Sequence, residues 1–136
     1  MSAEAPKIIV VDDDDAFRRV VARLLKANGF QALEPTTMTE IIGVIRKENP
    51  ELMLLDLCMP RTSGMEVVKT IRSMGMNLPV VIISGRIRPE DLEILRSHGV
   101  SEFLVKPFTM NTLLTRIEKV FGKPVVERSR RPADKG

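Results

Sequence analysis

Acidic side chains end two of the apolar segments in this sequence. The segment at 7–11 runs directly into four aspartates at 12–15, and a later segment ends in Asp56. Ser84 and Lys106 end two further segments in the same way. Carboxylates that face one another cannot all stay ionised unless a positive charge balances them. These residue types therefore predict a site that binds a cation, provided that the segment ends meet in the fold.

The carboxylates of Asp12, Asp13 and Asp56 are the candidate metal ligands. Hard oxygen ligands that leave positions for water and phosphate are those that Mg²⁺ selects. Together with Lys106, the three carboxylates and one divalent cation carry no net charge. At ~4 Å and an effective dielectric constant of ~20, each close charge pair is worth about 4 kcal/mol. Without its metal, the site should therefore destabilise the folded chain. We expect Mg²⁺ here, with Mn²⁺ as a substitute.

Five apolar segments, which alternate with helical patterns, must position these residues. The predicted strands are 7–11, 30–34, 52–57, 79–84 and 102–106. The helical patterns lie between and after them, at 17–25, 40–48, 65–71, 90–97 and 113–121. Several strands are almost continuously apolar, which is typical of strands covered on both faces of a parallel sheet. The pattern predicts an α/β fold of the (βα)₅ type, whose polar strand ends share one edge.

Capping residues and apolar stripes predict where helices begin and what they bury. Asp14 and Asp15 favour a helix start through the helix macrodipole, and Thr39 and Ser63 are predicted to begin two more helices. His98 is interpreted as a cation near a helix end and not as a metal ligand. In the first helix, the predicted buried stripe consists of Phe17, Val20, Val21, Leu24 and Leu25.

Length and composition favour a single globular domain. The chain has 136 residues, of which 43% are hydrophobic and 29% are charged, and these values are ordinary for a soluble protein. No apolar run approaches the ~18 residues of a membrane span, and the start, MSAEAP, lacks the features of a secretory signal. A single cysteine, Cys58, excludes an internal disulfide and favours a reducing compartment. We expect a cytoplasmic protein with no membrane contact.

The net charge of +3 comes from the end of the chain. Residues 122–136 contain five basic and two acidic residues, so residues 1–121 carry no net charge. A neutral globular part gives no electrostatic reason to bind nucleic acid, and we expect no such contact by this domain. We interpret residues 122–136 as a basic C-terminal tail or linker that follows a domain at 1–121.

Four motifs resemble those of the receiver domain of bacterial two-component response regulators: IIVVDDD, LMLLDLCMPRTSG, VVIISG and FLVKPF. The resemblance covers nearly all of residues 7–121, with every motif in the family's order and spacing. It implies a flavodoxin-like three-layer sandwich in which a parallel five-stranded sheet has the order 2-1-3-4-5. The domain at 1–121 is therefore expected to be a receiver domain.

The resemblance also implies a phosphorylation site and its metal ligands. Asp56 is expected to be the nucleophile that takes a phosphoryl group from a phosphohistidine. Asp13 and Asp56 would bind Mg²⁺ directly and Asp12 through water, with the backbone carbonyl of Cys58 as a further ligand. A carboxylate can attack phosphorus only if its charge and that of the incoming oxygens are screened. The metal and Lys106 are expected to provide that screening.

A phosphorylation switch is implied by the same resemblance. Ser84 and Lys106 would contact the phosphoryl oxygens, and Phe103 occupies the position of the family's aromatic switch residue. The bond between Lys106 and Pro107 is expected to be cis. Movement of Ser84 toward the phosphoryl group would open space for Phe103 to turn. The signal is therefore expected to leave through the surface formed by residues 86–121.

Cys58 and Arg86 are expected at the mouth of the site, each two positions after a site residue. We expect the bulky Arg86 side chain to slow hydrolysis of the acyl phosphate. Cys58 is not favoured as a reactive thiol, because nothing nearby in the sequence lowers its pKa. Ser63 stands where the family often has an aspartate and can still cap a helix, so little effect is expected.

The expected function is phosphorelay signalling, with at most self-phosphorylation from small phosphodonors and self-dephosphorylation as catalysis. Expected partners are a sensor histidine kinase or a histidine phosphotransfer protein, and a downstream target or an attached output domain. The chain would be a monomer or a dimer promoted by phosphorylation. A receiver-like scaffold that binds partners without phosphorylation is the alternative. A phosphatase with an aspartate nucleophile is disfavoured, because such enzymes need a second aspartate where Cys58 stands.

Overall fold

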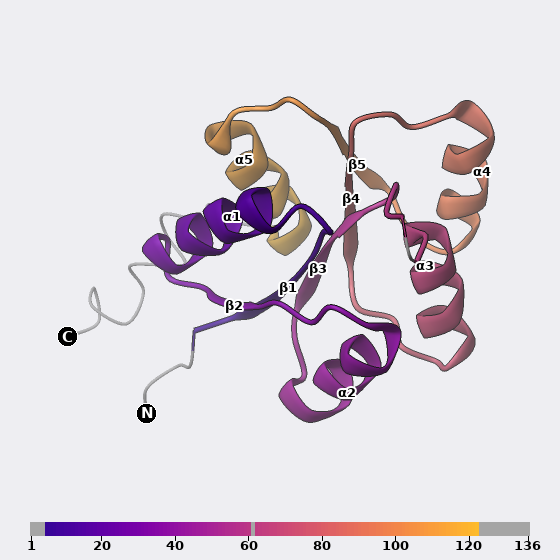
Figure 1. The fold of residues 1–136 in the computed structure, drawn as a ribbon, viewed down its shortest axis with the longest axis horizontal. Coiled ribbons are helices and arrows are strands. Elements are labelled where there is room, and N and C mark those ends of the chain that lie inside the picture. Colours follow the sequence, from indigo (N-terminus) through magenta and orange to yellow (C-terminus); the bar gives the residue numbers. More distant parts are fainter. Residues whose placement is uncertain (1–4, 61, 123–136) are drawn as a thin grey trace.

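The computed structural model describes residues 5–60 and 62–122, in which strands and helices alternate (Figure 1). The strands are β1 (Lys7–Val11), β2 (Gln31–Leu33), β3 (Leu52–Asp56), β4 (Val80–Ser84) and β5 (Glu102–Val105). The helices are α1 (Asp15–Ala27), α2 (Met38–Glu48), α3 (Gly64–Ser73), α4 (Pro89–Ser97) and α5 (Met110–Phe121). Within the described ranges, none of these helices has both the length and the apolar character that crossing a bilayer requires. Of the predicted tail at 122–136, all residues after Gly122 lie outside the described part of the chain.

The strands form one parallel sheet in the order β2-β1-β3-β4-β5. β1 and β3 are neighbours at its centre, with Val11 opposite Leu55. Because all the strands run in the same direction, their carboxyl ends meet at one edge of the sheet. This order confirms the predicted (βα)₅ flavodoxin-like topology.

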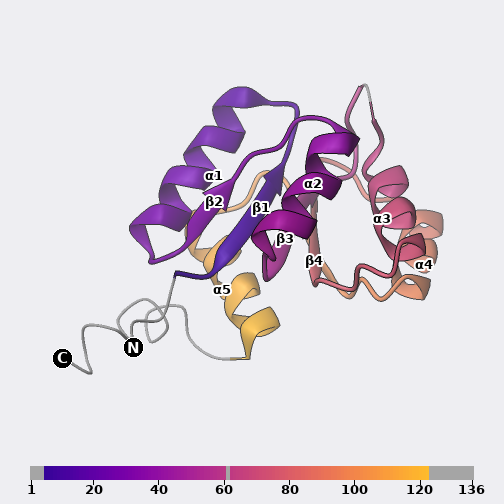
Figure 2. The same cartoon turned by 90° about the horizontal axis from the view of Figure 1, so that it is seen from below.

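Helices cover both faces of the sheet, which makes a three-layer sandwich (Figures 1 and 2). α1 and α5 lie on one face, and α2, α3 and α4 lie on the other. Successive residues of β1 serve the two layers: Ile8 and Val10 belong to the core beneath α1 and α5, whereas Ile9 and Val11 belong to the opposite core. Burial on both faces explains the continuous apolar strands, since each fully buried aliphatic side chain contributes about 1.5–3 kcal/mol.

Side-chain caps set the helix starts, and one predicted start is wrong. Asp14 caps α1 and Ser63 caps α3, as the sequence predicts. Thr39, however, lies inside α2, and the residue that caps this helix is Thr37, whose Oγ1 accepts a hydrogen bond from the backbone N–H of Glu40 at 3.1 Å. The spacing of Thr37 and Glu40 is that of a capping box. The correct signal was therefore present two residues upstream of the predicted one.

The predicted buried stripe of α1 and the predicted start of the second strand also need correction. Val21 and Leu25 are fully buried, but Val20 is 51% exposed. A core on one side of a helix buries a stripe only about 100° wide, and Val20 lies outside that stripe. The second strand begins at Gln31, because the backbone N–H of Phe30 donates to the carbonyl of Leu25 and closes the end of α1.

Candidate functional site

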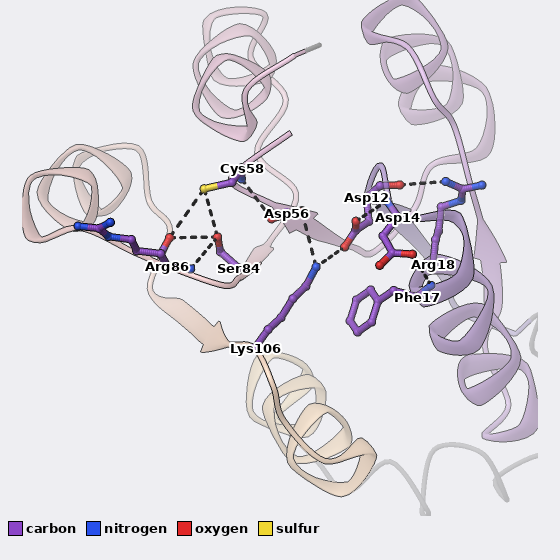
Figure 3. A network of polar contacts seen from close by, with 9 residues as sticks. All are labelled: Asp12, Asp14, Phe17, Arg18, Asp56, Cys58, Ser84, Arg86 and Lys106. Carbon is purple, nitrogen blue, oxygen red and sulfur yellow. Dashed lines mark hydrogen bonds and ion pairs between the residues drawn. The ribbon is translucent and has the colours of Figure 1, made fainter. Parts of the chain in front are cut away.

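Polar residues from three strands meet at the carboxyl edge of the sheet (Figure 3). Asp12 follows β1, and Asp56 is the last residue of the neighbouring strand β3. Lys106 follows β5, and its backbone N–H donates to the carbonyl of Ser84 at the end of β4, at 2.7 Å. The peptide bond between Lys106 and Pro107 is cis. The sheet thus positions two carboxylates beside one ammonium group.

The Lys106 ammonium bridges the two carboxylates. Its Nζ lies 2.9 Å from Asp12 Oδ2 and 3.6 Å from Asp56 Oδ2. The second oxygen of each carboxylate accepts a backbone N–H: Asp12 Oδ1 from Asp14 at 2.9 Å, and Asp56 Oδ1 from Cys58 at 3.1 Å. Both carboxylates are therefore fixed on one oxygen and share the cation on the other.

Burial and mutual repulsion perturb the ionisation of these groups. The side chains of Asp12 and Asp56 are 1% and 9% exposed, and that of Lys106 is 24% exposed. Burial raises the pKa of Asp56, and the charge of Asp12 adds to the rise, while the Cys58 N–H and Lys106 oppose it. Burial alone would lower the pKa of Lys106, but hydrogen bonds and charge from the two aspartates together raise it. The three groups keep an excess of negative charge, because two acids share one cation.

The third predicted ligand, Asp13, is exposed and is not one of the carboxylates that Lys106 bridges. It lines a hollow at the edge of the site together with Asp12, Thr36 and Thr62. In the part of the chain that the structure describes, no three acidic, histidine or cysteine side chains are grouped closely enough to hold a metal ion. The structure thus joins Asp12 and Asp56 through Lys106, and Asp13 lines the adjoining hollow beside Asp12. Buried carboxylate oxygens with excess negative charge are nevertheless the ligand type that Mg²⁺ selects, so the residues fit such an ion in chemistry and charge.

The Ser84 hydroxyl is fully buried and faces the loop that follows β4. It donates to the backbone carbonyl of Arg86 at 3.1 Å, and it lies 3.6 Å from the Cys58 sulfur (Figure 3). Cys58 and the exposed Arg86 also line one hollow, together with Ser63 and Met65. The two predicted mouth residues therefore lie beside Ser84, and in this state the hydroxyl is engaged by its own loop.

Phe103 lies between the elements of the predicted output surface. The side chain is half-buried in the core that α2, α3 and α4 cover. The guanidinium of Arg96 in α4 lies 5.6 Å from the centre of its ring. The backbone carbonyl of Phe103 accepts a hydrogen bond from Nη1 of Arg116 in α5, at 2.7 Å. A rotation of this ring would therefore change contacts with α4.

Arg18 supports the site, although the sequence patterns did not predict this. Its side chain is 11% exposed, and Nη1 donates to the backbone carbonyl of Asp12 at 2.9 Å. The guanidinium also pairs with Asp15 at 2.7 Å and with Glu34 at 3.0 Å. Arg18 thereby ties α1 and the end of β2 to the strand end that carries Asp12. The available signal was its i,i+3 spacing from Asp15.

The family profile and the relatives that match this chain all describe the same kind of protein. Residues 8–118 match the family profile described as "Response regulator receiver domain". Response regulator MprA of Mycobacterium leprae (strain TN) is 32% identical over 111 residues, which are 82% of this chain and 49% of that protein. Response regulator MprA of Mycobacterium ulcerans (strain Agy99) is 31% identical over 121 residues, which are 89% of this chain and 52% of that protein. The chain thus spans about half the length of these curated relatives.

Solved structures resemble the whole sandwich. A response regulator receiver protein from Pseudomonas putida has a TM-score of 0.78 and 29% identity, over 86% of this chain and 98% of that one. The chemotaxis protein CheY4 of Vibrio cholerae has a TM-score of 0.78 and 26% identity, over 85% and 98%. A CheY-like receiver domain protein from Methanospirillum hungatei shares the fold with a TM-score of 0.78 and 21% identity, over 93% and 98%.

Proposed function

The chain belongs to the response regulator receiver family, and we propose that Asp56 is its phosphoacceptor. Receiver domains act in two-component phosphorelay signalling, as signalling proteins and not as classical enzymes. Response regulators in general interact with sensor kinases and output domains. The observation that supports the proposal is the Lys106 ammonium, 2.9 Å from Asp12 and 3.6 Å from Asp56, at a buried strand end.

In the proposed reaction, a carboxylate oxygen of Asp56 attacks the phosphorus of a phosphohistidine. The new P–O bond forms as the P–N bond breaks, and the imidazole nitrogen keeps the electron pair and takes up a proton. Lys106 remains protonated at neutral pH because its partners raise its pKa. It can therefore screen the charge of the incoming phosphoryl oxygens beside Asp56.

The proposed metal is Mg²⁺, for which Mn²⁺ can substitute. Asp12, Asp13 and Asp56 would hold it, with the backbone carbonyl of Cys58 as a further ligand. When bound, the ion neutralises the negative charge that gathers around phosphorus. Asp12 and Asp56 are prepared for this role, because a backbone N–H already fixes one oxygen of each.

Ser84 and Phe103 are proposed to carry the signal from the site. A phosphoryl group adds negative charge and strong acceptor oxygens close to Ser84. A hydrogen bond to a charged oxygen is stronger than one to the Arg86 carbonyl, so the hydroxyl exchanges its partner. The space left by that movement admits the ring of Phe103, which turns away from Arg96. The contacts of α4, β5 and α5 then change together.

The proposed phosphodonor is a sensor histidine kinase or a histidine phosphotransfer protein in the cytoplasm. The signal passes to a protein target or to an attached output domain. We propose that the chain acts as a monomer or as a dimer promoted by phosphorylation, and that this domain makes no direct contact with nucleic acid.

Arg86 is proposed to slow hydrolysis of the acyl phosphate, because its exposed side chain stands beside Cys58 at the edge of the site. The phosphorylated Arg86→Ala variant should lose phosphate faster than the parent in a time course of intact mass. An unchanged half-life of the phosphorylated form would remove Arg86 from this role.

The proposed function is tested by incubating the chain with Mg²⁺ and a small acyl phosphate, followed by intact-mass measurement. We expect a phosphoryl adduct on the parent and none on Asp56→Asn. Asp14→Asn is the matched control, because asparagine can still cap α1 and the lost carboxylate is exposed. A parent without an adduct would contradict the proposal and favour the scaffold alternative. Turnover of a phosphate ester would favour the phosphatase.

A further inference from the structure

The ring of Phe17 forms one wall of the position that the Lys106 ammonium occupies (Figure 3). Phe17 lies in the first turns of α1, and Lys106 Nζ is 4.2 Å from the centre of its ring. The same nitrogen is 2.9 Å from Asp12 and 3.6 Å from Asp56. The ammonium therefore has carboxylates on one side and an aromatic face on another.

A second aromatic ring holds Phe17 in this orientation. Phe108 meets Phe17 edge to face, with ring centres 5.8 Å apart and an angle of 82° between the planes. Phe108 lies two residues after Lys106, in the segment that leads into α5. Both rings are half-buried and pack against the core beneath α1 and α5. The segment that carries Lys106 thus also fixes the ring that Lys106 contacts.

This arrangement limits where a flexible lysine can place its charge. A lysine side chain has several rotatable bonds and loses conformational entropy when it is held in one position. An aromatic face attracts a cation through its quadrupole, most strongly where water is excluded. The Phe17 face attracts the ammonium from one side, and Asp12 and Asp56 attract it from another, so the charge is held beside the two carboxylates.

We propose that Phe17 is a positioning residue for phosphoryl transfer, whose ring keeps the Lys106 ammonium beside Asp56. This inference rests on the proposed function of Asp56. Phe17 touches neither the phosphorus nor the attacking oxygen in this account, and it acts only through Lys106. The competing interpretation is that Phe17 serves the core alone, as its place in the α1 stripe would suggest.

Three variants separate the two interpretations. Phe17→Leu keeps an apolar side chain and removes the ring. Phe17→Tyr keeps the ring and should behave as the parent does. Phe30→Leu is the matched control, because Phe30 belongs to the same core, is 3% exposed and stacks on Phe121, away from Lys106.

The first readout is the NMR signal of the Lys106 ε protons in the unphosphorylated chain, assigned by its absence from Lys106→Met. A ring face displaces nearby protons upfield, so the signal should lie upfield in the parent, in Phe17→Tyr and in Phe30→Leu. It should return toward the other lysines in Phe17→Leu. This measurement needs no phosphorylation, so its result does not depend on the proposed function.

The second readout is the rate of adduct formation with Mg²⁺ and a small acyl phosphate. We expect Phe17→Leu to react roughly twofold to thirtyfold more slowly than the parent, because that ratio of rates corresponds to the free energy of a cation–π contact. Phe17→Tyr and Phe30→Leu should react at close to the parental rate. With an active parent, a parental rate in Phe17→Leu, or an equal loss in Phe30→Leu, would overturn the inference. An inactive parent would instead count against the function proposed for Asp56.

Discussion

The Lys106 ammonium lies 2.9 Å from the Asp12 carboxylate, although the two residues are 94 positions apart in the sequence. The contact exists because the carboxyl ends of all strands meet at one edge of a parallel sheet. It gives the site one cation for the carboxylates of Asp12 and Asp56, and the remaining negative charge makes the site receptive to a metal ion.

Replacing Asp56 with asparagine should stabilise the chain at neutral pH. Burial raises the pKa of Asp56 above its ordinary 3.8, so between the ordinary and the raised pKa the folded state binds more protons than the unfolded state. The free energy of unfolding therefore falls as pH rises through this window, and the loss persists at neutral pH. The Asp56→Asn variant has no carboxyl at this position to ionise, so its free energy of unfolding does not fall in this way. Thermal unfolding followed by circular dichroism should give a higher midpoint for Asp56→Asn at pH 7 than for the parent.

The pH dependence provides the control for this prediction. The difference between Asp56→Asn and the parent should shrink as the pH falls below the ordinary pKa of 3.8, because the carboxyl then becomes protonated in both states. Asp14→Asn, which removes an exposed carboxylate, should differ little from the parent at either pH. A parent that is more stable than Asp56→Asn at pH 7 would show that the Lys106 contact outweighs burial.

Magnesium should stabilise the chain, and Asp13 should be needed for the full effect. An ion that binds only the folded state raises the unfolding midpoint in proportion to the logarithm of its concentration above Kd. We expect Mg²⁺ to raise the midpoint relative to a chelator-treated sample. The increase should be smaller for Asp13→Asn and unchanged for Asp14→Asn. Equal increases in both variants would exclude Asp13 as a ligand.

Replacing the buried Arg18 with methionine should cost stability. The variant loses the hydrogen bond to the Asp12 carbonyl and the pairs with Asp15 and Glu34. A buried hydrogen-bonding group left without its partner typically costs ~1–3 kcal/mol in free energy of unfolding. Urea unfolding should show a loss of that size. Arg19→Met, at the adjacent exposed position, should stay within ~0.5 kcal/mol of the parent; equal losses would remove the special role of Arg18.

Gly64 and Gly43 should respond in opposite directions to replacement by alanine. A Cβ at Gly64 would meet the backbone oxygen of Asp56 and would lie 2.7 Å from Cα of Leu57, so the strand end that carries Asp56 must move. Overpacking of this kind costs about 1–3 kcal/mol, and adduct formation should slow. Gly43 lies within α2 with nothing within 4 Å of such a Cβ, so Gly43→Ala should stabilise the chain by about 0.5–1 kcal/mol. Tolerance of Gly64→Ala in urea unfolding would contradict the close approach.

The strand ends could be predicted from the sequence because each one is a local pattern. An apolar run that stops at Asp12, Asp56, Ser84 or Lys106 marks both the strand and its polar end. The parallel sheet then brings these ends to one edge without further information. The start of α2 is also a local pattern, since the spacing of Thr37 and Glu40 identifies Thr37 as the capping residue.

The contacts between helices and the site could not be predicted in the same way. The periodicity of the first helix predicts that Phe17 faces the core, but its contact with Lys106 depends on α1 and the segment before α5 sharing one layer. The burial of Arg18 depends likewise on Glu34, which lies beyond the next turn of the chain.

The most direct test of the central claim locates the phosphoryl group. The chain is phosphorylated with Mg²⁺ and a small acyl phosphate and then treated with borohydride, which reduces an aspartyl phosphate to homoserine. Peptide mass spectrometry should find the conversion at position 56 and leave Asp12 and Asp13 as aspartate. Conversion at Asp12 or Asp13, or none anywhere in the chain, would contradict the assignment of Asp56 as the phosphoacceptor.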